Sequence, residues 1–234
     1  DQKGISKGDL AFWDIITTNA GKRPVCFTAW YDAAEHGLKN NLIFDGLVYR
    51  LTSDTTSCTT ILNSGKIDTE SLYRRLMIRC KWDNLSKPNI YFDWHHRRML
   101  ASMQIRNAFY RLASKLTQEQ QTAKALNVIK KAEQTISLNL WPTDYQSILM
   151  AALYAPNGQK KQGEEQFRKL ASDLEEKLEY YTQFTSEKKE SIRSDAEYQL
   201  SLYNELIKQA TNTLNEKELD EMKNRLIRFA EKLS

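Results

Sequence analysis

Proline and glycine are scarce over the second half of this chain, and that scarcity restricts what the half can fold into. After residue 93 the two residue types occur only at Pro142, Pro156, Gly158 and Gly163. Because both interrupt helices, the long intervals between them favour helices over short strands joined by tight turns. The four positions divide residues 94–234 into helices of ordinary length.

Within these intervals, apolar residues recur as in a two-helix repeat of about 34 residues. A repeat starting at residue 106 places seven apolar or small residues at its key positions: Phe109, Leu112, Ala113, Leu116, Ala125, Ile129 and Ala132. A second start at residue 144 gives a more degenerate set: Ser147, Met150, Ala151, Tyr154, Gly163, Phe167 and Leu170. Any amphipathic helix pair would satisfy much of this pattern.

Two more helices are expected over residues 186–214 and 216–233, where apolar residues recur at intervals of three and four. One helical hairpin cannot cover its own apolar face, so copies must stack, and about three units are usually needed. The final helix has a polar outer face, which suits a solvated cap. We therefore predict a TPR-like helical-repeat domain over residues 94–234.

A different pattern precedes it and predicts a small α+β unit over residues 1–93. Helical spacing of apolar residues runs from Leu10 to Ala20, with a capping box formed by Ser6 and Asp9 and a stop at Gly21. From Pro24 to Trp30, and again over 47–51, strand-forming residues dominate. The predicted fold class is mainly α, with a small N-terminal α+β unit followed by the TPR-like array.

Three sets of residues in this region resemble a family of bacterial multi-pass membrane proteins related to protein O-mannosyltransferases, in their C-terminal part. The first set is Thr18, Asn19, Lys22, Arg23, Pro24, Val25 and Phe27, and the second is Gly46, Leu47, Tyr49, Arg50 and Leu51. The third is Lys81, Trp82, Asn84, Pro88, Tyr91, Asp93, Arg106, Asn107 and Phe109. The resemblance covers most of residues 1 to about 175.

The resemblance implies a non-catalytic, extracytoplasmic accessory domain of a membrane glycosyltransferase-like protein. Such a domain would lie in the periplasm or at the outer face of the inner membrane, joined to a multi-pass region, and would position an acceptor or partner protein or peptide. The parent protein would take sugar from a lipid-phosphate donor at a site outside these residues. The alternative is a stand-alone TPR-like scaffold for protein–protein interaction with no link to glycosylation.

Charge argues against nucleic acid as a partner, because a net charge of +4 on 234 residues provides no strongly basic face. Basic residues are nevertheless concentrated between residues 72 and 115. The candidates for a membrane-proximal basic patch are Arg74, Arg75, Arg79, Arg97 and Arg98. They would face anionic headgroups or a phosphate-bearing lipid carrier. The alternative is that they lie on solvated helix faces.

No catalytic, cofactor-binding or metal site is predicted. The adjacent His95 and His96 point about 100° apart on a helix, so they cannot chelate one metal together, and His36 is the only other histidine. Cys26 is expected to be a buried small hydrophobe. Carboxylates such as Glu175 alternate with lysines and are expected on a solvated face. An autonomous hydrolase is disfavoured because no nucleophile and base can be paired.

Aromatic residues near Asp and Asn side chains suggest a possible glycan or partner contact. Flat rings stack on pyranose faces, and the candidates are Trp30, Tyr31, Trp82, Tyr91 and Trp94. Tryptophan and tyrosine also serve as ordinary core and interface anchors. Both roles stay open at the level of sequence.

Overall fold

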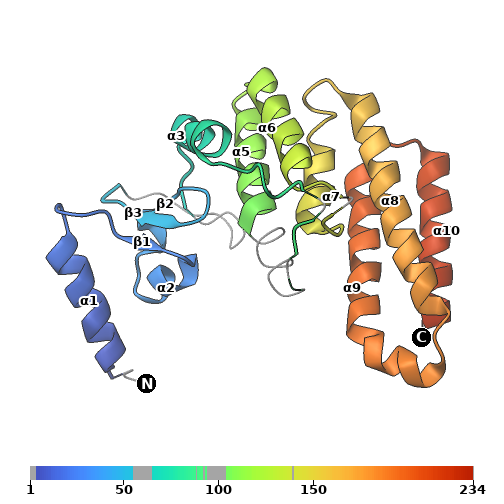
Figure 1. Ribbon diagram of the computed structural model, residues 1–234, viewed down its shortest axis with the longest axis horizontal. Helices are drawn as coiled ribbons and strands as arrows, with labels where there is room; N and C mark the ends of the chain where they lie inside the picture. The colour runs from blue at the N-terminus through green and yellow to red at the C-terminus, as the bar shows by residue number, and fades with distance from the viewer. Residues whose placement is uncertain are drawn as a thin grey trace. The chain divides into compact units, whose positions relative to one another are not determined.

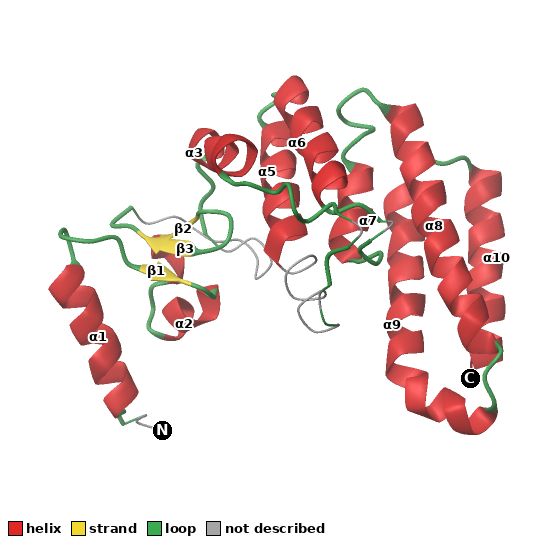
Figure 2. Ribbon diagram, in the orientation of Figure 1, coloured by secondary structure: helices red, strands yellow, loops and turns green. Residues whose placement is uncertain are grey.

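The computed structural model describes residues 4–54, 65–87, 89–91, 93, 104–138 and 140–233. The chain divides into two compact units, residues 1–81 and 82–234. Helices dominate, and the described strands form one small antiparallel sheet near the N-terminus (Figures 1 and 2), which confirms the predicted fold class. The predicted domain boundary after residue 93 stays a prediction, since residues 94–103 lie outside the described part of the chain.

The first unit opens with helix α1 (Lys7–Asn19), which confirms the helix predicted over residues 10–20. Its capping box is formed as expected: the Asp9 amide donates to Ser6 Oγ at 3.1 Å, and the Ser6 amide donates to Asp9 Oδ2 at 2.7 Å. These two bonds satisfy amide groups that a helix N-terminus otherwise leaves unpaired.

Three short strands follow in the spatial order β1-β3-β2: β1 (Cys26–Phe27), β3 (Tyr49–Leu51) and β2 (Leu42–Phe44). Cys26 pairs with Arg50, and Leu42 pairs with Leu51. Helix α2 (Trp30–Glu35) and a 3-10 turn, η1 (Lys39–Asn41), connect β1 to β2. The sequence did not predict β2, although Leu42–Phe44 is apolar.

Two expectations about β1 were wrong. The apolar run from Pro24 forms only two paired residues, and Trp30 begins α2 instead of ending a strand. Cys26 is exposed, not buried. The reason is that β1 is a short edge strand whose side chains alternate in direction, so Phe27 is half-buried while Cys26 faces solvent.

The turn before β3 requires glycine. Gly46 has φ +95°, and a Cβ added there would lie 3.2 Å from a Leu76 methyl and 3.3 Å from a Leu72 methyl. Those leucines belong to α3 (Thr69–Arg74) and to the π-helical turn η2 (Arg75–Arg79). The glycine of the Gly46–Leu51 motif thus allows this helical segment to pack closely on the turn.

The second unit, in its described part, is built of helices that pack on one another. They are α5 (Asn107–Gln118), α6 (Thr122–Thr135), α7 (Tyr145–Ala152), α8 (Lys160–Thr182), α9 (Ser186–Ala210) and α10 (Glu216–Leu233). Helix α5 packs along α6, and α7 contacts α5, α8 and α9. Helices α8, α9 and α10 contact one another and form a three-helix group (Figure 1).

Burial follows the predicted register closely. All seven key positions of the repeat starting at residue 106 are buried, and so are six of the seven in the second copy, where Ser147 is half-buried. The two copies correspond to the pairs α5–α6 and α7–α8. The assignment to the TPR repeat in particular stays a prediction, because burial at these positions is also typical of other stacked helix pairs.

One carboxylate connects three helices of this unit. Glu175 on α8 accepts a hydrogen bond from the Tyr203 hydroxyl on α9 and pairs with Arg225 Nε on α10 at 3.1 Å. The expectation of a solvated Glu175 was therefore wrong, because its partners come from helices distant in sequence. The core beneath includes Phe167, Leu206 and other apolar residues with almost no exposed surface.

Candidate functional site

The aromatic residues proposed as a glycan shelf fall in both units. Trp30 and Tyr31 lie together on α2, with ring centroids 6.3 Å apart and planes at 80°. Lys39 Nζ lies 5.7 Å from the Trp30 ring centroid, and Tyr31 is 55% exposed. This pair could stack a ligand only on the exposed tyrosine and on the tryptophan face that Lys39 leaves open.

The other aromatic candidates belong to the second unit. Trp82 is 8% exposed, and its ring centroid is 5.5 Å from that of Phe109, so of the two roles left open it has the placement of a core residue. Tyr91 is 86% exposed. Trp94 lies outside the described residues. The predicted aromatic candidates are therefore divided between the two units, and neither unit contains the whole set.

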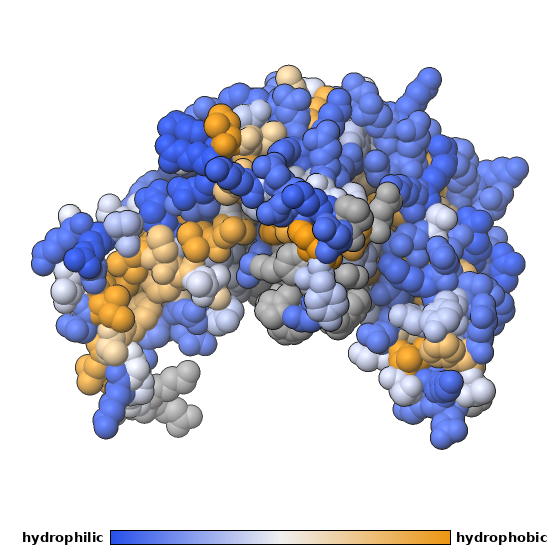
Figure 3. All heavy atoms as spheres, viewed as in Figure 1, coloured by the Kyte–Doolittle hydropathy of each residue, from blue (hydrophilic) through white to orange (hydrophobic). Residues whose placement is uncertain are grey.

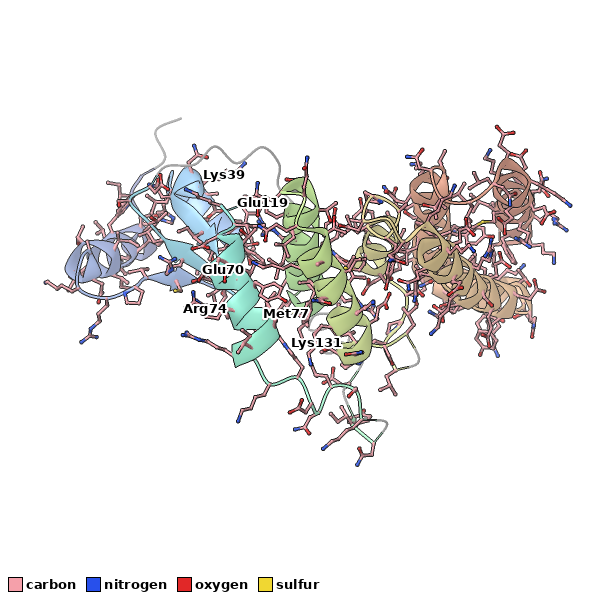
Figure 4. The ribbon with its side chains drawn as sticks, turned by 90° about the horizontal axis from the view of Figure 1, so that it is seen from above. Lys39, Glu70, Arg74, Met77, Glu119 and Lys131 are labelled. Atoms are coloured by element: carbon pink, nitrogen blue, oxygen red, sulfur yellow. The ribbon has the colours of Figure 1, made fainter. Side chains whose placement is uncertain are left out.

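The basic candidates differ in their surroundings. Arg75 contributes to the fold, because its Nη2 lies 3.3 Å from Oδ2 of the buried Asp45, which Arg50 also contacts at 3.0 Å. Arg74 and Arg79 are exposed, and Figure 4 shows Arg74 beside Glu70 on α3. Arg97 and Arg98 lie outside the described residues. Two arginines thus remain as described members of an accessible patch.

Helix α1 exposes a large amount of apolar surface. No described residue of α1 is buried, and large apolar side chains stand in solvent at Leu10, Trp13 and Ile15, exposed by 61%, 41% and 55%. Ile5, just before the helix, is 75% exposed. Figure 3 shows this apolar surface along the N-terminal helix. The surface is an unpaired hydrophobic face of the kind that usually contacts another molecule.

A cleft between α6 and α8, with α7 beneath it, is one of the concave sites in the described part of the second unit. Its cavity volume is about 80 Å³, and the cleft is partly open to solvent. Its floor is apolar, and its rim carries Glu133, Gln146, Gln166 and Lys169. An apolar floor with a few polar groups is the usual composition of a binding site.

The carboxylate at the rim has an unusual environment. The Tyr154 hydroxyl donates to Glu133 Oε2 at 2.9 Å. Burial raises the pKa of Glu133, while the hydrogen bond from Tyr154 and the charges of Lys169 and Lys130 oppose that rise. Burial next to this carboxylate also raises the pKa of Tyr154, so the hydroxyl keeps its proton and remains a donor.

Arg106 holds the wall of the cleft in place. It is 4% exposed, and its Nη1 donates to Asp144 Oδ2 at 2.5 Å and to the Pro142 carbonyl at 2.6 Å. Its Nη2 donates to the Ile136 carbonyl at 3.2 Å. Asp144 in turn caps α7, because its Oδ1 accepts from the Ser147 amide at 2.8 Å. One guanidinium therefore fixes the end of α6, the connecting loop and the start of α7.

Sequence reasoning used Arg106 and Asp144 as register starts, and Arg106 also as part of the family resemblance, but it missed this ion pair and the cleft. A signal was available, because each is a charged residue beside the start of a helix with an apolar buried face. Their 38-residue separation, however, gives no indication of contact before the helices are packed.

Among the residues that the structure describes, no group of three or more histidine, cysteine or acidic side chains could hold a metal ion. His36 pairs with Asp9, while His95 and His96 lie outside the described ranges. No helix within the described ranges is long and apolar enough to cross a bilayer.

Comparison with known protein families yields a match over the N-terminal part of the chain. Residues 1–71 match the model of the TMEM260-associated domain 2. This stretch contains α1, the sheet and the motifs at Thr18–Phe27 and Gly46–Leu51. No curated protein and no solved structure matches the chain. The chain is therefore similar over its first unit to a domain associated with TMEM260, which is consistent with a family related to glycosyltransferases.

Proposed function

We propose that this chain is a non-catalytic accessory region of a membrane glycosyltransferase-like protein and that its helical unit binds a partner polypeptide. The observation that carries the proposal is the cleft between α6 and α8. Its floor, which includes Ala132, Met150 and Leu170, suits an apolar side chain of the partner. Glu133 and the two glutamine amides at the rim can bond to the partner's main chain.

The glycosyltransferase context rests on the first unit. The match to a TMEM260-associated domain over residues 1–71 supports it, and so do the residues that resemble the family related to protein O-mannosyltransferases. In this proposal the parent protein performs sugar transfer with residues outside this chain. In the same proposal the chain lies in the periplasm or at the outer face of the inner membrane and positions an acceptor protein.

Binding by the cleft is tested with peptides. A peptide selected from a random-sequence library against the 234-residue chain is labelled, and its Kd is measured by fluorescence anisotropy. Lys169→Glu and Gln166→Trp alter the rim from exposed or half-buried positions, and each is expected to weaken binding about tenfold or more. Lys208→Glu on α9 is the matched control, because it makes the same charge change outside the cleft.

The cleft would lose its proposed role if both rim variants bound the peptide as the unaltered chain does. Photo-crosslinking from p-benzoylphenylalanine at Gln166 gives an independent map of where the peptide lies. Sugar transfer by this chain alone, from a lipid-phosphate donor to a peptide, would contradict the non-catalytic assignment.

The second candidate is a protein-interaction scaffold unrelated to glycosylation, which the same cleft would serve. The two candidates differ in the gene segment that encodes the residues upstream of Asp1. Multiple hydrophobic spans there support the accessory role, whereas an upstream region without such spans leaves only the scaffold.

A further inference from the structure

His36, the residue after α2, uses one ring nitrogen to contact α1 and the other to contact α2 itself. Its Nδ1 lies 2.9 Å from the Asp32 main-chain carbonyl oxygen, and its Nε2 lies 3.0 Å from Asp9 Oδ1. A carbonyl oxygen and a carboxylate oxygen both accept hydrogen bonds. The ring must therefore donate from both nitrogens, and only the protonated imidazolium does so.

The same ring is also the centre of an aromatic stack. Phe12 of α1 lies on its face, with ring centroids 3.7 Å apart and planes within 13°. Trp13 meets it edge-on at 6.2 Å, and Phe12 also stacks with Phe27 of β1 at 5.8 Å. A protonated ring on an aromatic face gains cation–π attraction that a neutral ring lacks.

These contacts are the main described attachment of α1. None of the described α1 side chains is fully buried, and its apolar contacts with the rest of the unit come from the half-buried Phe12 and Ile16. The charged groups facing His36 are Asp9 from α1 and Glu35 from α2, and both favour the imidazolium. No described cation faces the ring at close range to oppose it.

We propose that His36 is a pH-dependent latch: protonated, it holds α1 against β1 and α2, and on losing its proton it releases the helix. A neutral ring keeps one N–H. It therefore loses either the bond to Asp32 or the bond to Asp9, together with the ion pair and the cation–π attraction. Release frees Phe12 and Ile16, which are half-buried, to join the exposed apolar surface of α1.

The pH window follows from both partners. The bond to the Asp32 carbonyl and then the interactions with Asp9 raise the pKa of His36 above 6.5, against an opposing effect of burial. Bonds from the Ser6 main chain and side chain, and then from His36, lower the pKa of Asp9 below 3.8. The latch is thus fully formed between pH 3.8 and 6.5, and it is lost as pH rises through the raised pKa of His36.

The test uses NMR on the 234-residue chain. The ring protons of His36 give its titration midpoint, and the backbone heteronuclear NOE values report the order of α1. We expect NOE values in α1 to match those of β3 at pH 6 and to fall well below them at pH 8.5. His36→Phe keeps a ring in the stack but removes the proton, and it should make the order of α1 independent of pH.

Two further variants keep the test decisive if His36→Phe perturbs the fold. Asp9→Asn removes the carboxylate and should lower the His36 midpoint. Asp14→Asn removes the other acidic side chain of α1, which contacts Thr18 and not His36, and should leave the midpoint unchanged. Equal order of α1 at both pH values in the unaltered chain would overturn the proposal, as would a His36 midpoint that Asp9→Asn fails to lower.

Discussion

The first and last described helices, α1 and α10, differ in a way that their compositions do not predict: the less charged helix is the less buried one. α1 carries few charges, yet buries none of its described side chains. α10 has a strongly negative mean hydropathy and a charged residue in most turns, yet buries Leu219, Met222 and Phe229. The difference lies in their neighbours: α10 packs against both α8 and α9, whereas the described contacts of α1 include the stack around Phe12 and the pair between Asp9 and His36. Apolar content alone therefore does not determine burial, because a helix needs a complementary surface to cover it.

The largest effect is expected in the well-packed helical unit, when its buried acid Asp144 is removed. In Asp144→Ala the Arg106 guanidinium stays buried without its carboxylate, and α7 loses its cap. We expect a loss of about 4 kcal/mol in the free energy of unfolding. Urea denaturation followed by far-ultraviolet circular dichroism measures this loss.

Asp220→Ala is the control for this prediction, because Asp220 forms an exposed pair with Lys223 on α10. It should cost less than about 1 kcal/mol. Asp144→Asn should fall between the two, since an amide can still cap α7. Equal stabilities for Asp144→Ala and Asp220→Ala would mean that Arg106 finds another partner in the variant.

A direct comparison of the two helices needs one aromatic truncation in each. Phe229→Ala empties a buried position of α10 and should destabilise the helical unit by about 3 kcal/mol. Trp13→Ala removes a larger ring from α1 but should change stability by less than about 0.5 kcal/mol, because that ring is already 41% exposed. Thermal unfolding followed by circular dichroism measures both. A larger loss for Trp13→Ala would show that α1 has a partner surface in solution.

Glycine-to-alanine changes provide the smallest expected contrast. A Cβ at Gly163 on α8 would lie 3.2 Å from Tyr154 Cβ and 3.3 Å from Thr213 Cγ2, so we expect Gly163→Ala to cost about 1 to 2 kcal/mol. At Gly8 on α1 a Cβ would meet only Ser6 Oγ, at 3.4 Å. Gly8→Ala should therefore stabilise α1 by up to about 1 kcal/mol through helix propensity. Amide hydrogen exchange in each helix tests both, and opposite signs are the expected result.

Local signals in the sequence predicted much of the fold. The capping box at Ser6, the seven buried positions of the first helix pair and the limits of α10 all depend on residues close in sequence, and all agree with the structure. The strands were harder. β1 and β2 have two and three paired residues, too few for a periodic pattern, and their pairing with β3 depends on a turn that brings Asp45 and Gly46 together with η2.

The candidate site was not predictable in the same way. The cleft exists because α6 and α8 stand apart over α7, and the Arg106–Asp144 pair that fixes its wall joins residues far apart in the chain. For the aromatic candidates, the sequence identified the residues but not which of them would be buried. Trp82 and Tyr91 have similar sequence surroundings, but one packs on Phe109 and the other stands in solvent. Their difference depends on tertiary packing, which neither spacing nor composition encodes.

The spatial order of the sheet affects how fragments of this protein can be prepared. β1 is only two residues long, yet together with the Val25 carbonyl it covers one entire edge of β3. A fragment trimmed to begin after Phe27 would leave the main-chain groups of Tyr49 to Leu51 open along that edge, where a second molecule could pair with them. Such a fragment should self-associate through strand addition. Peptide-binding measurements therefore require a chain that begins before Pro24.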